Sequence, residues 1–306
     1  MKAWIAALCS AFLLSGLAGT ASAQLGEALQ ALMPRGHATY ADVAYANRDP
    51  VRNLLDIYVP RHVENPPLVV QIHGGGFAFG DKSDPDGLDM FLRAGMAVAS
   101  INYRLSDTTT WPGQLDDLSD AFAFLRDAGP DYGYDGSRIA SFGASAGGHL
   151  SAMAGIVLSA DDASRLRASV VLFPPILFDK MDEDAASIGM VPVTGETSGP
   201  SSPESILIGA PVGENPDLAA AASPLTYLEA LPDDTPLPAF LILHGADDRN
   251  IARGQSGRLF TALLNRPTIT NLEYHLLPDS GHGTGAFNGL EPMLMVIEFL
   301  RESLAE

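Results

Sequence analysis

The sequence predicts an α/β fold with a mostly parallel, twisted central sheet and helices on both of its faces. Short apolar runs of strand length alternate along the chain with stretches in which apolar residues recur at helical spacing. Most of the short runs are apolar throughout, as expected of strands that are covered on both faces. The 306 residues are 46% hydrophobic and 18% charged, a composition typical of a globular protein rather than a disordered one.

The first part of the chain is expected to lead into the sheet. Within residues 24–50 a helix is predicted over 25–32, followed by an irregular segment. The alternating run over 54–59 predicts the first strand. Pro60 should end it, because proline has no N–H to donate to a neighbouring strand.

The next elements follow with short connections. The continuous apolar run over 68–72 predicts a strand buried on both faces. A helix is expected over 88–94, closed by Gly95, since glycine favours the left-handed conformation that ends many helices. A second buried strand is predicted over 96–101, and apolar residues at helical spacing predict a helix over 114–128.

The remaining elements continue the alternation. A strand is expected from residue 139 to a turn at 143, then a helix over 146–158 and a strand over 168–173 stopped by two prolines. The last expected elements are a strand over 240–244, a helix over 254–264, a strand over 271–277 and a helix over 291–304.

The first 23 residues are predicted to be a signal peptide rather than part of the fold. Lys2 precedes an apolar stretch over 4–17, and Ala21-Ser22-Ala23 is an A-x-A cleavage site. The apolar stretch is short and soon followed by small residues, so a membrane anchor is the less favoured alternative. We therefore expect a secreted or periplasmic protein with no membrane span after signal removal, and one domain over residues 24–306.

Cysteine content and charge exclude several classes of function. Cys9 is the only cysteine and lies in the predicted signal, so the mature chain would have no disulfide and no cysteine nucleophile. Removing Lys2 would change the formal net charge from −19 to −20, since −19 − 1 = −20. Such a charge argues against nucleic-acid partners and anionic lipid surfaces. Nothing in the sequence sets the oligomeric state.

One segment interrupts the alternation of strands and helices. Residues 179–215 contain the acidic patch Asp182-Glu183-Asp184 and then a run rich in Pro, Gly, Ser and Thr that ends at Ser205. A long irregular insertion of this kind is often functional or mobile. Two interpretations stay open: a cap that shapes a substrate pocket, or a loose surface loop.

The sequence around Ser145 predicts a nucleophile. Gly143-Ala144-Ser145-Ala146-Gly147 is a G-x-S-x-G pattern between an expected strand and an expected helix. In this pattern a strained strand-to-helix turn pushes the serine hydroxyl into the open. The flanking glycines are needed because a side chain there would collide with the neighbouring strand or the following helix.

A second glycine motif predicts an oxyanion hole. His73-Gly74-Gly75-Gly76 follows the apolar run over 68–72 and lies upstream of Ser145, as this chemistry requires. Its backbone N–H groups can stabilise the negative oxygen of a tetrahedral intermediate. We expect the donors to be the N–H groups of Gly75, Gly76 and Ala146.

A serine nucleophile needs a base and an acid that orients it, expected in the chain order Ser, Asp or Glu, His. His282 lies just beyond the last expected strand, in Asp279-Ser280-Gly281-His282-Gly283, and is the expected base. The other six histidines are poorer candidates for the base because of their positions before the sheet, in the glycine motif, in a helix or at strands: His37, His62, His73, His149, His244 and His275. The acid should follow the strand that ends at His244, where position alone does not separate Asp247 from Asp248.

These motifs together resemble secreted α/β-hydrolase-fold esterases of the hormone-sensitive-lipase-like and acetylxylan/feruloyl esterase-like (BD-FAE) type. The resemblance runs from about Leu54 to the C-terminus. The matching stretches are 55–60, 72–77, 99–105, 139–150, 222–224 and His244-Gly245-Ala246-Asp247-Asp248. The last is similar to the family pattern H-G-x-x-D, which implies that Asp248 is the acid. Two features depart from the pattern: Ala144, where many relatives have an acidic residue, and the insertion over 179–205.

The expected function is ester hydrolysis by a secreted serine esterase. Ser145 would attack the carbonyl carbon and form an acyl-enzyme, His282 would transfer the proton, and Asp248 would orient the imidazole. No metal and no organic cofactor is expected. The substrate would be a small-molecule or polymer-borne ester. The alternatives are an amide-cleaving hydrolase of the peptidase or formamidase type and a non-catalytic binding protein on a hydrolase scaffold.

Overall fold

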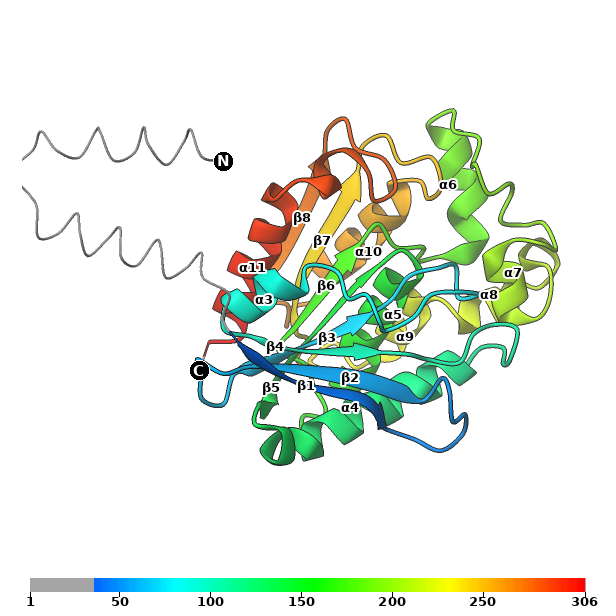
Figure 1. The fold of residues 1–306 in the computed structure, drawn as a ribbon. Helices are drawn as coiled ribbons and strands as arrows, with labels where there is room; N and C mark the ends of the chain where they lie inside the picture. Colours follow the sequence, from blue (N-terminus) through cyan, green and yellow to red (C-terminus); the bar gives the residue numbers. More distant parts are fainter. Residues whose placement is uncertain (1–35, 306) are drawn as a thin grey trace, which may run out of the picture. The chain divides into compact units, whose positions relative to one another are not determined.

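An eight-stranded sheet forms the centre of the fold in the computed structural model, which describes residues 36–305 (Figure 1). The strand order is β1-β2-β4-β3-β5-β6-β7-β8. The six strands from β4 to β8 in this order are parallel, and β2 is antiparallel to both of its neighbours. The prediction of a mostly parallel sheet is confirmed. The strands are β1 His37–Ala44, β2 Leu54–Pro60, β3 Pro67–Ile72, β4 Ala97–Ile101, β5 Asp135–Ala144, β6 Ala168–Leu172, β7 Ala239–Gly245 and β8 Leu272–Leu277.

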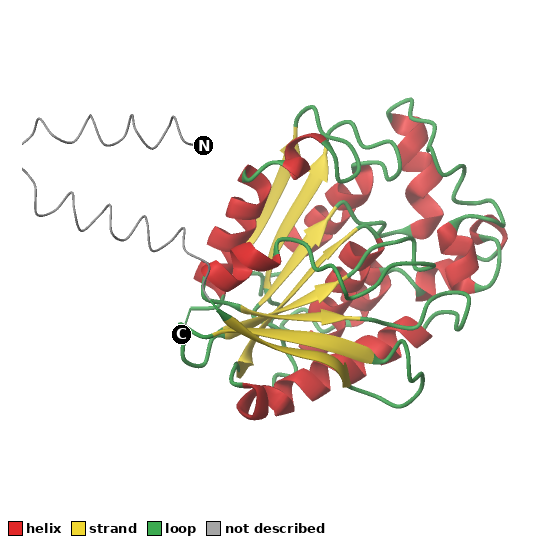
Figure 2. Ribbon diagram, in the orientation of Figure 1, coloured by secondary structure: helices red, strands yellow, loops and turns green. Residues whose placement is uncertain are grey.

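Helices cover both faces of the sheet, as predicted (Figure 2). Along β3 the side chains alternate: Leu68 and Val70 pack into a core with α4 and α5, whereas Val69 packs into a core with α3 and α11. Because both faces are covered, the strand is apolar except for Gln71, whose amide donates to the Asp86 carbonyl. The helices are α3 Leu88–Arg93, α4 Gly113–Tyr132, α5 Ala146–Val157, α6 Met181–Ser187, α7 Pro203–Ile208, α8 Pro216–Ala221, α9 Pro224–Ala230, α10 Gly254–Leu264 and α11 Glu291–Ser303.

The predicted irregular segment before the first strand is partly wrong. Residues 37–44 form β1, an edge strand antiparallel to β2, with a bulge between Tyr40 and Val43. Most of its residues are partly or fully exposed, so the apolar pattern that identifies a buried strand is missing. Pairing with β2 creates this strand, and a local pattern does not report such pairing.

Two other boundaries differ from expectation. Helix α4 continues to Tyr132, four residues beyond the predicted end, and Gly133 closes it in the left-handed conformation with φ 84°. Strand β5 accordingly begins at Asp135 rather than at residue 139. Helix α4 packs against β5.

The insertion over residues 179–215 is more ordered than predicted. It contains the helices α6 and α7, and short turns of 3₁₀ helix flank them. The Asp182 carboxylate accepts the backbone N–H groups of Thr197 and Ser198 at 2.7 and 2.9 Å. Asp184 binds Gln255 and Arg258 on α10. The acidic patch therefore ties the insertion together and attaches it to the sheet-covering helices.

Some predictions lie outside the described residues, namely the signal peptide over 1–23 and the helix over 25–32. Between residues 36 and 305, no helix combines the length and hydropathy needed to cross a bilayer.

Candidate active site

Ser145 lies at the abrupt turn between β5 and α5, as the glycine pattern predicts. Its backbone has φ 57° and ψ −122°, a region that costs a non-glycine residue about 1–3 kcal/mol. Two hydrogen bonds hold this conformation: the Ser145 N–H donates to the Leu172 carbonyl at 2.9 Å, and the His149 N–H donates to the Ser145 carbonyl at 3.0 Å. The strained residue is therefore fixed by the neighbouring strand and by its own helix.

The two flanking glycines are required by close backbone contacts. A Cβ on Gly143 would lie 2.1 Å from the Gly147 carbonyl oxygen. A Cβ on Gly147 would lie 2.1 Å from the Ile72 carbonyl oxygen at the end of β3. Since neither backbone oxygen can move away, no larger residue fits at either position.

Three side chains from distant parts of the chain meet at Ser145. The Ser145 Oγ lies 2.9 Å from His282 Nε2, and His282 Nδ1 lies 2.8 Å from Asp248 Oδ2. With a neutral imidazole, this arrangement has Nδ1–H donating to the carboxylate, so Nε2 is free to accept the serine proton. The three residues follow β5, β7 and β8, and all lie at the carboxyl ends of parallel strands.

The loops that hold Asp248 and His282 are joined by backbone hydrogen bonds. The Ala246 N–H donates to the Leu277 carbonyl, and the Asp247 N–H donates to the Ser280 carbonyl, both at 2.8 Å. The Phe173 ring, 4.6 Å from the His282 ring between centroids, packs against the imidazole. These contacts fix the imidazole between its two partners before any ligand binds.

The structure distinguishes the two adjacent carboxylates. Asp247 is exposed, whereas Asp248 is 3% exposed and contacts His282. Burial by itself would raise the pKa of Asp248, but hydrogen bonds from His244 and His282 outweigh it and hold the pKa well below its usual range. Asp248 is therefore ionised and can stabilise a positive imidazole.

His244 is a second histidine beside Asp248, and the sequence indicated only that it ends a strand. Its Nε2 lies 3.0 Å from the Ile251 carbonyl and 3.4 Å from Asp248 Oδ2, and its Nδ1 lies 2.7 Å from Ser256 Oγ. The other carboxylate oxygen accepts the N–H groups of Asn250 and Ile251. In the sequence, the one pattern that includes His244 is H-G-x-x-D, which does not predict that its side chain contacts Asp248.

The His73 side chain supports the glycine motif through contacts with the neighbouring backbone and side chains. Its ring stacks on Tyr103 with 4.4 Å between centroids, and Arg52 Nη2 donates to its Nε2 at 3.0 Å. Nδ1–H therefore donates to the Gly74 carbonyl at 2.8 Å. Burial lowers the pKa of His73 to about 4, so the ring is neutral and serves as a fixed support.

The glycine loop presents free N–H groups beside Ser145. Gly75 and Gly76 have φ 111° and 56°, and a Cβ on Gly75 would lie 2.1 Å from the Phe79 carbonyl oxygen. Within residues 36–305, the N–H groups of Gly75, Gly76 and Ala146 find no acceptor. All three residues line the same cavity as Ser145. This part of the site can accept a negatively charged oxygen.

Ser145 and His282 open into a cavity of about 650 Å³. Phe79, Phe173 and Ile251 form part of its apolar wall, together with residues of the insertion. The insertion contributes Met181, Thr194, Ser201, Pro203, Glu204 and Ile206. Of the two interpretations of residues 179–215, this lining favours the cap that shapes the pocket.

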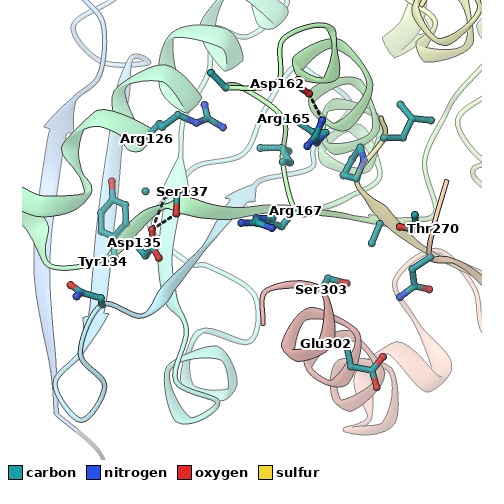
Figure 3. A pocket seen from close by; sticks show the side chains of 18 of the residues that line it. Arg126, Tyr134, Asp135, Ser137, Asp162, Arg165, Arg167, Thr270, Glu302 and Ser303 are labelled. Carbon is teal, nitrogen blue, oxygen red and sulfur yellow. Dashed lines mark hydrogen bonds and ion pairs between the residues drawn. The ribbon is translucent and has the colours of Figure 1, made fainter. Parts of the chain in front are cut away.

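A larger cavity of about 1060 Å³ lies at the opposite edge of the sheet, where the parallel strands begin (Figure 3). It is lined by polar residues such as Arg126, Asp135, Arg165 and Arg167, and it contains none of the predicted site residues. Across the described part of the chain, no three His, Cys, Asp or Glu side chains cluster closely enough to hold a metal ion.

Comparison with known proteins identifies relatives of this chain. The BD-FAE family model matches residues 55–263. Esterase LipQ of Mycobacterium tuberculosis is 30% identical over 75% of this chain and 54% of its own length. The probable carboxylic ester hydrolase LipM of the same organism is 27% identical over 89% of this chain and 63% of its own length. The chain thus spans about half to three-fifths of the length of these relatives.

A solved structure agrees with these sequence relationships. A truncated form of a carbohydrate esterase from gut microbiota superposes with a TM-score of 0.75 and 25% identity, covering 89% of this chain and 98% of that one. The family model covers well over half of the chain, and the fold agrees with that of the esterase. The chain therefore belongs to the BD-FAE family, and its architecture is the α/β-hydrolase fold of the esterases to which it is similar.

Proposed function

We propose that this protein hydrolyses carboxylic esters through a covalent acyl-enzyme, with Ser145, His282 and Asp248 as its catalytic triad. The observation that carries the proposal is the position of His282, hydrogen-bonded at once to Ser145 Oγ and to Asp248 Oδ2. A serine is a weak nucleophile unless an oriented base removes its proton. The names of LipQ, LipM and the gut carbohydrate esterase support the same reaction class.

In the first half of the reaction, Ser145 Oγ bonds to the ester carbonyl carbon while its proton passes to His282 Nε2. The resulting tetrahedral intermediate carries the negative charge on the former carbonyl oxygen. The intermediate collapses by breaking the bond to the alcohol oxygen, which takes the proton from Nε2 and leaves. The acyl group stays on Ser145, and Asp248 stabilises the imidazolium during the transfer.

In the second half, water replaces the alcohol. Its oxygen bonds to the acyl carbon, and His282 takes one of its protons. Collapse breaks the bond to Ser145 Oγ, which recovers its proton from the imidazolium, and the carboxylic acid is released. No electron transfer occurs in either half, and every proton that His282 takes up is returned.

The oxyanion is proposed to bind the N–H groups of Gly75, Gly76 and Ala146. These N–H groups donate no hydrogen bond to any other described residue, so they need not break an interaction when the negative charge develops. Such preorganised donors are each worth about 3 kcal/mol of activation free energy. The strained Ser145 and the close-packed glycines hold them in place.

The proposal is tested with a chain-length series of nitrophenyl esters, run beside acetylated xylan, a feruloyl ester and matched amides. We expect ester turnover that the Ser145→Ala variant loses. Faster turnover of amides than of their matched esters would assign the protein to the amide-cleaving alternative. Binding without turnover of any of these compounds would contradict the esterase assignment.

We also propose that residues 1–23 direct export and are removed, on the evidence of the A-x-A site in the sequence. N-terminal sequencing of the protein from the periplasm and the medium should then begin at Gln24. Recovery of the full-length chain from the cytoplasm alone would contradict this.

A further inference from the structure

Glu204 is a buried acid in the wall of the catalytic cavity that the mechanism above does not use. It lies on the cap helix α7, is 6% exposed, and lines the cavity together with Ser145 and His282. Acidic side chains are rarely this buried unless they are paired. Its position raises the question of what its carboxyl group binds.

The carboxyl group of Glu204 has few partners among the described residues. Among the described residues no cation pairs with it, and its hydrogen bonding is limited to its own backbone N–H. The nearby charge is the Asp182 carboxylate, which is of the same sign. Burial, followed by the repulsion from Asp182, raises the pKa of Glu204 to about 7.

Apart from the bond to its own N–H, this carboxyl group takes no part in the hydrogen bonds at the start of α7. The N-cap residue of helix α7 is Ser202, whose Oγ accepts the Ser205 N–H at 3.0 Å. Ser202 and Ser205 also make the other side-chain hydrogen bonds at the start of this helix. An apolar side chain of the same length would avoid the cost of burying a polar group. A group that is unfavourable for folding and faces a reaction cavity is a candidate for recognition of a ligand.

The rest of the cavity narrows the choice of ligand. Its wall is mainly apolar, and the other titratable groups that line it are Asp86 and His282. Burial, followed by repulsion from Asp84, also raises the pKa of Asp86. A neutral carboxylic acid both donates and accepts a hydrogen bond, as a hydroxyl group does, so the two are complementary. A substrate carboxylate would meet two acids and no cation of the described residues.

We propose that Glu204 is a specificity residue that selects esters carrying a hydroxyl group near the scissile bond and rejects esters carrying a carboxylate. This inference rests on the proposed esterase function, and it names the substrate class for the same site. Glu204 makes its contact with the part of the substrate that does not react, so it adds no step to the mechanism.

The first experiment compares kcat/KM for two matched substrate pairs. The pairs are nitrophenyl butyrate with nitrophenyl 3-hydroxybutyrate, and butyl acetate with 4-hydroxybutyl acetate, so that a hydroxyl is placed on either side of the ester. We expect the hydroxylated member of at least one pair to be preferred by about tenfold, the factor given by one ordinary hydrogen bond. Glu204→Met should abolish the preference, and Glu204→Gln should retain it.

The second experiment compares a substrate that carries a carboxylate with a neutral substrate over a range of pH. The ratio of kcat/KM for nitrophenyl hemisuccinate to that for nitrophenyl butyrate should fall as pH rises through about 7, because Glu204 becomes negative. Protonation of His282 affects both substrates alike and cancels in the ratio. The hemisuccinate carboxylate is already ionised above about pH 6. In Glu204→Gln the ratio should be higher and independent of pH across this range.

The matched control is Glu214→Gln, which neutralises an exposed acid of the same insertion and should leave every ratio unchanged. If the wild-type enzyme hydrolyses esters but shows no hydroxyl preference in either pair, or keeps it in Glu204→Met, the role of Glu204 is wrong while the proposed function stands. If Glu204→Met does not fold, a pH-independent ratio in the wild type overturns the inference. Absence of any ester hydrolysis that depends on Ser145 would refute the proposed function itself.

Discussion

Two cavities at opposite edges of one sheet differ in how their polar groups are satisfied. In the larger one, two lining acids have ion-pair partners: Asp162 contacts Arg165, and Asp135 binds Arg138, which lies outside the lining, at 2.7 Å. In the smaller one, the N–H groups of the glycine loop find no acceptor within residues 36–305. The larger volume therefore does not mark the candidate site of this protein. The unsatisfied N–H groups and the strained Ser145 favour the smaller cavity.

The topology explains why the two edges differ. At the carboxyl edge, β5 runs directly into α5, so a helix start and a strained residue face the cavity. Loops after β7 and β8 reach the same edge, because these strands are parallel to β5 through β6. At the amino edge, charged and polar side chains line the larger cavity, and Asp162 there contacts Arg165 (Figure 3).

The largest expected effect is at the nucleophile. Ser145→Ala should lower kcat for ester hydrolysis by about 10⁶-fold, as loss of the nucleophile does in other serine hydrolases. Steady-state kinetics with a nitrophenyl ester, with the folded state checked by circular dichroism, measure this. Retained hydrolysis in the folded variant would move the reaction away from this cavity.

The two adjacent carboxylates provide a matched test of the acid. Asp248→Asn should lower kcat by about 10⁴-fold, because the amide no longer stabilises the imidazolium or fixes its tautomer. Asp247→Asn removes an exposed carboxylate and should change kcat by less than about threefold. Similar losses in the two variants would contradict the assignment of Asp248.

Buried histidine at the catalytic edge should make folding stability depend on pH. Burial lowers the pKa of His149 to about 4 from an ordinary 6.5, so between these values the unfolded chain binds more protons than the folded one. The contribution is therefore complete above about pH 6.5 and is lost as pH falls toward 4, a change of ~3 kcal/mol in the free energy of unfolding.

Denaturant unfolding at a series of pH values measures this change. His149→Gln should show a shallower loss between pH 6.5 and 4 than the wild type, while His275→Gln, at a side chain 39% exposed, should not. Equal slopes in all three proteins would show that His149 is not a buried neutral group.

The aromatic support of the base should have a smaller effect on the reaction. Phe173→Ala removes the ring that packs on His282, so we expect kcat to fall about tenfold through misplacement of the imidazole. Phe124→Ala on α4 removes an aromatic ring that packs beside Tyr132 instead, and should affect stability more than kcat. Equal kcat values for the two variants would argue against a positioning role for Phe173.

The smallest expected effect is at the larger cavity. Arg167 is exposed and lines the larger cavity, at the sheet edge opposite Ser145. Arg167→Ala should therefore change kcat/KM by less than about twofold. A loss comparable to that of Phe173→Ala would show that the two edges are coupled, and the comparison drawn above would no longer hold.

The sequence by itself determined the parts that depend on local patterns. Mainly apolar runs predict β3, β4 and β7, because strands covered on both faces contain few polar residues. The turn at Ser145 was predictable because its glycines are required by backbone contacts within a short segment and with one neighbouring strand. His282 was predictable because of its position after the last strand and its flanking glycines.

Only the tertiary structure decided the features that depend on distant partners. Strand β1 exists because β2 supplies its hydrogen bonds, and the insertion is ordered because Asp182 and Asp184 bind groups that the sequence does not place near them. The family pattern favoured Asp248, but its contact with His282 and the second contact with His244 are properties of the folded chain. In the sequence, nothing separates Glu204 from the other acidic residues. Its burial in the wall of the cavity that contains Ser145 distinguishes it in the structure. Local patterns report which face of an element is buried, whereas the environment of a polar side chain is set by the residues that folding brings around it.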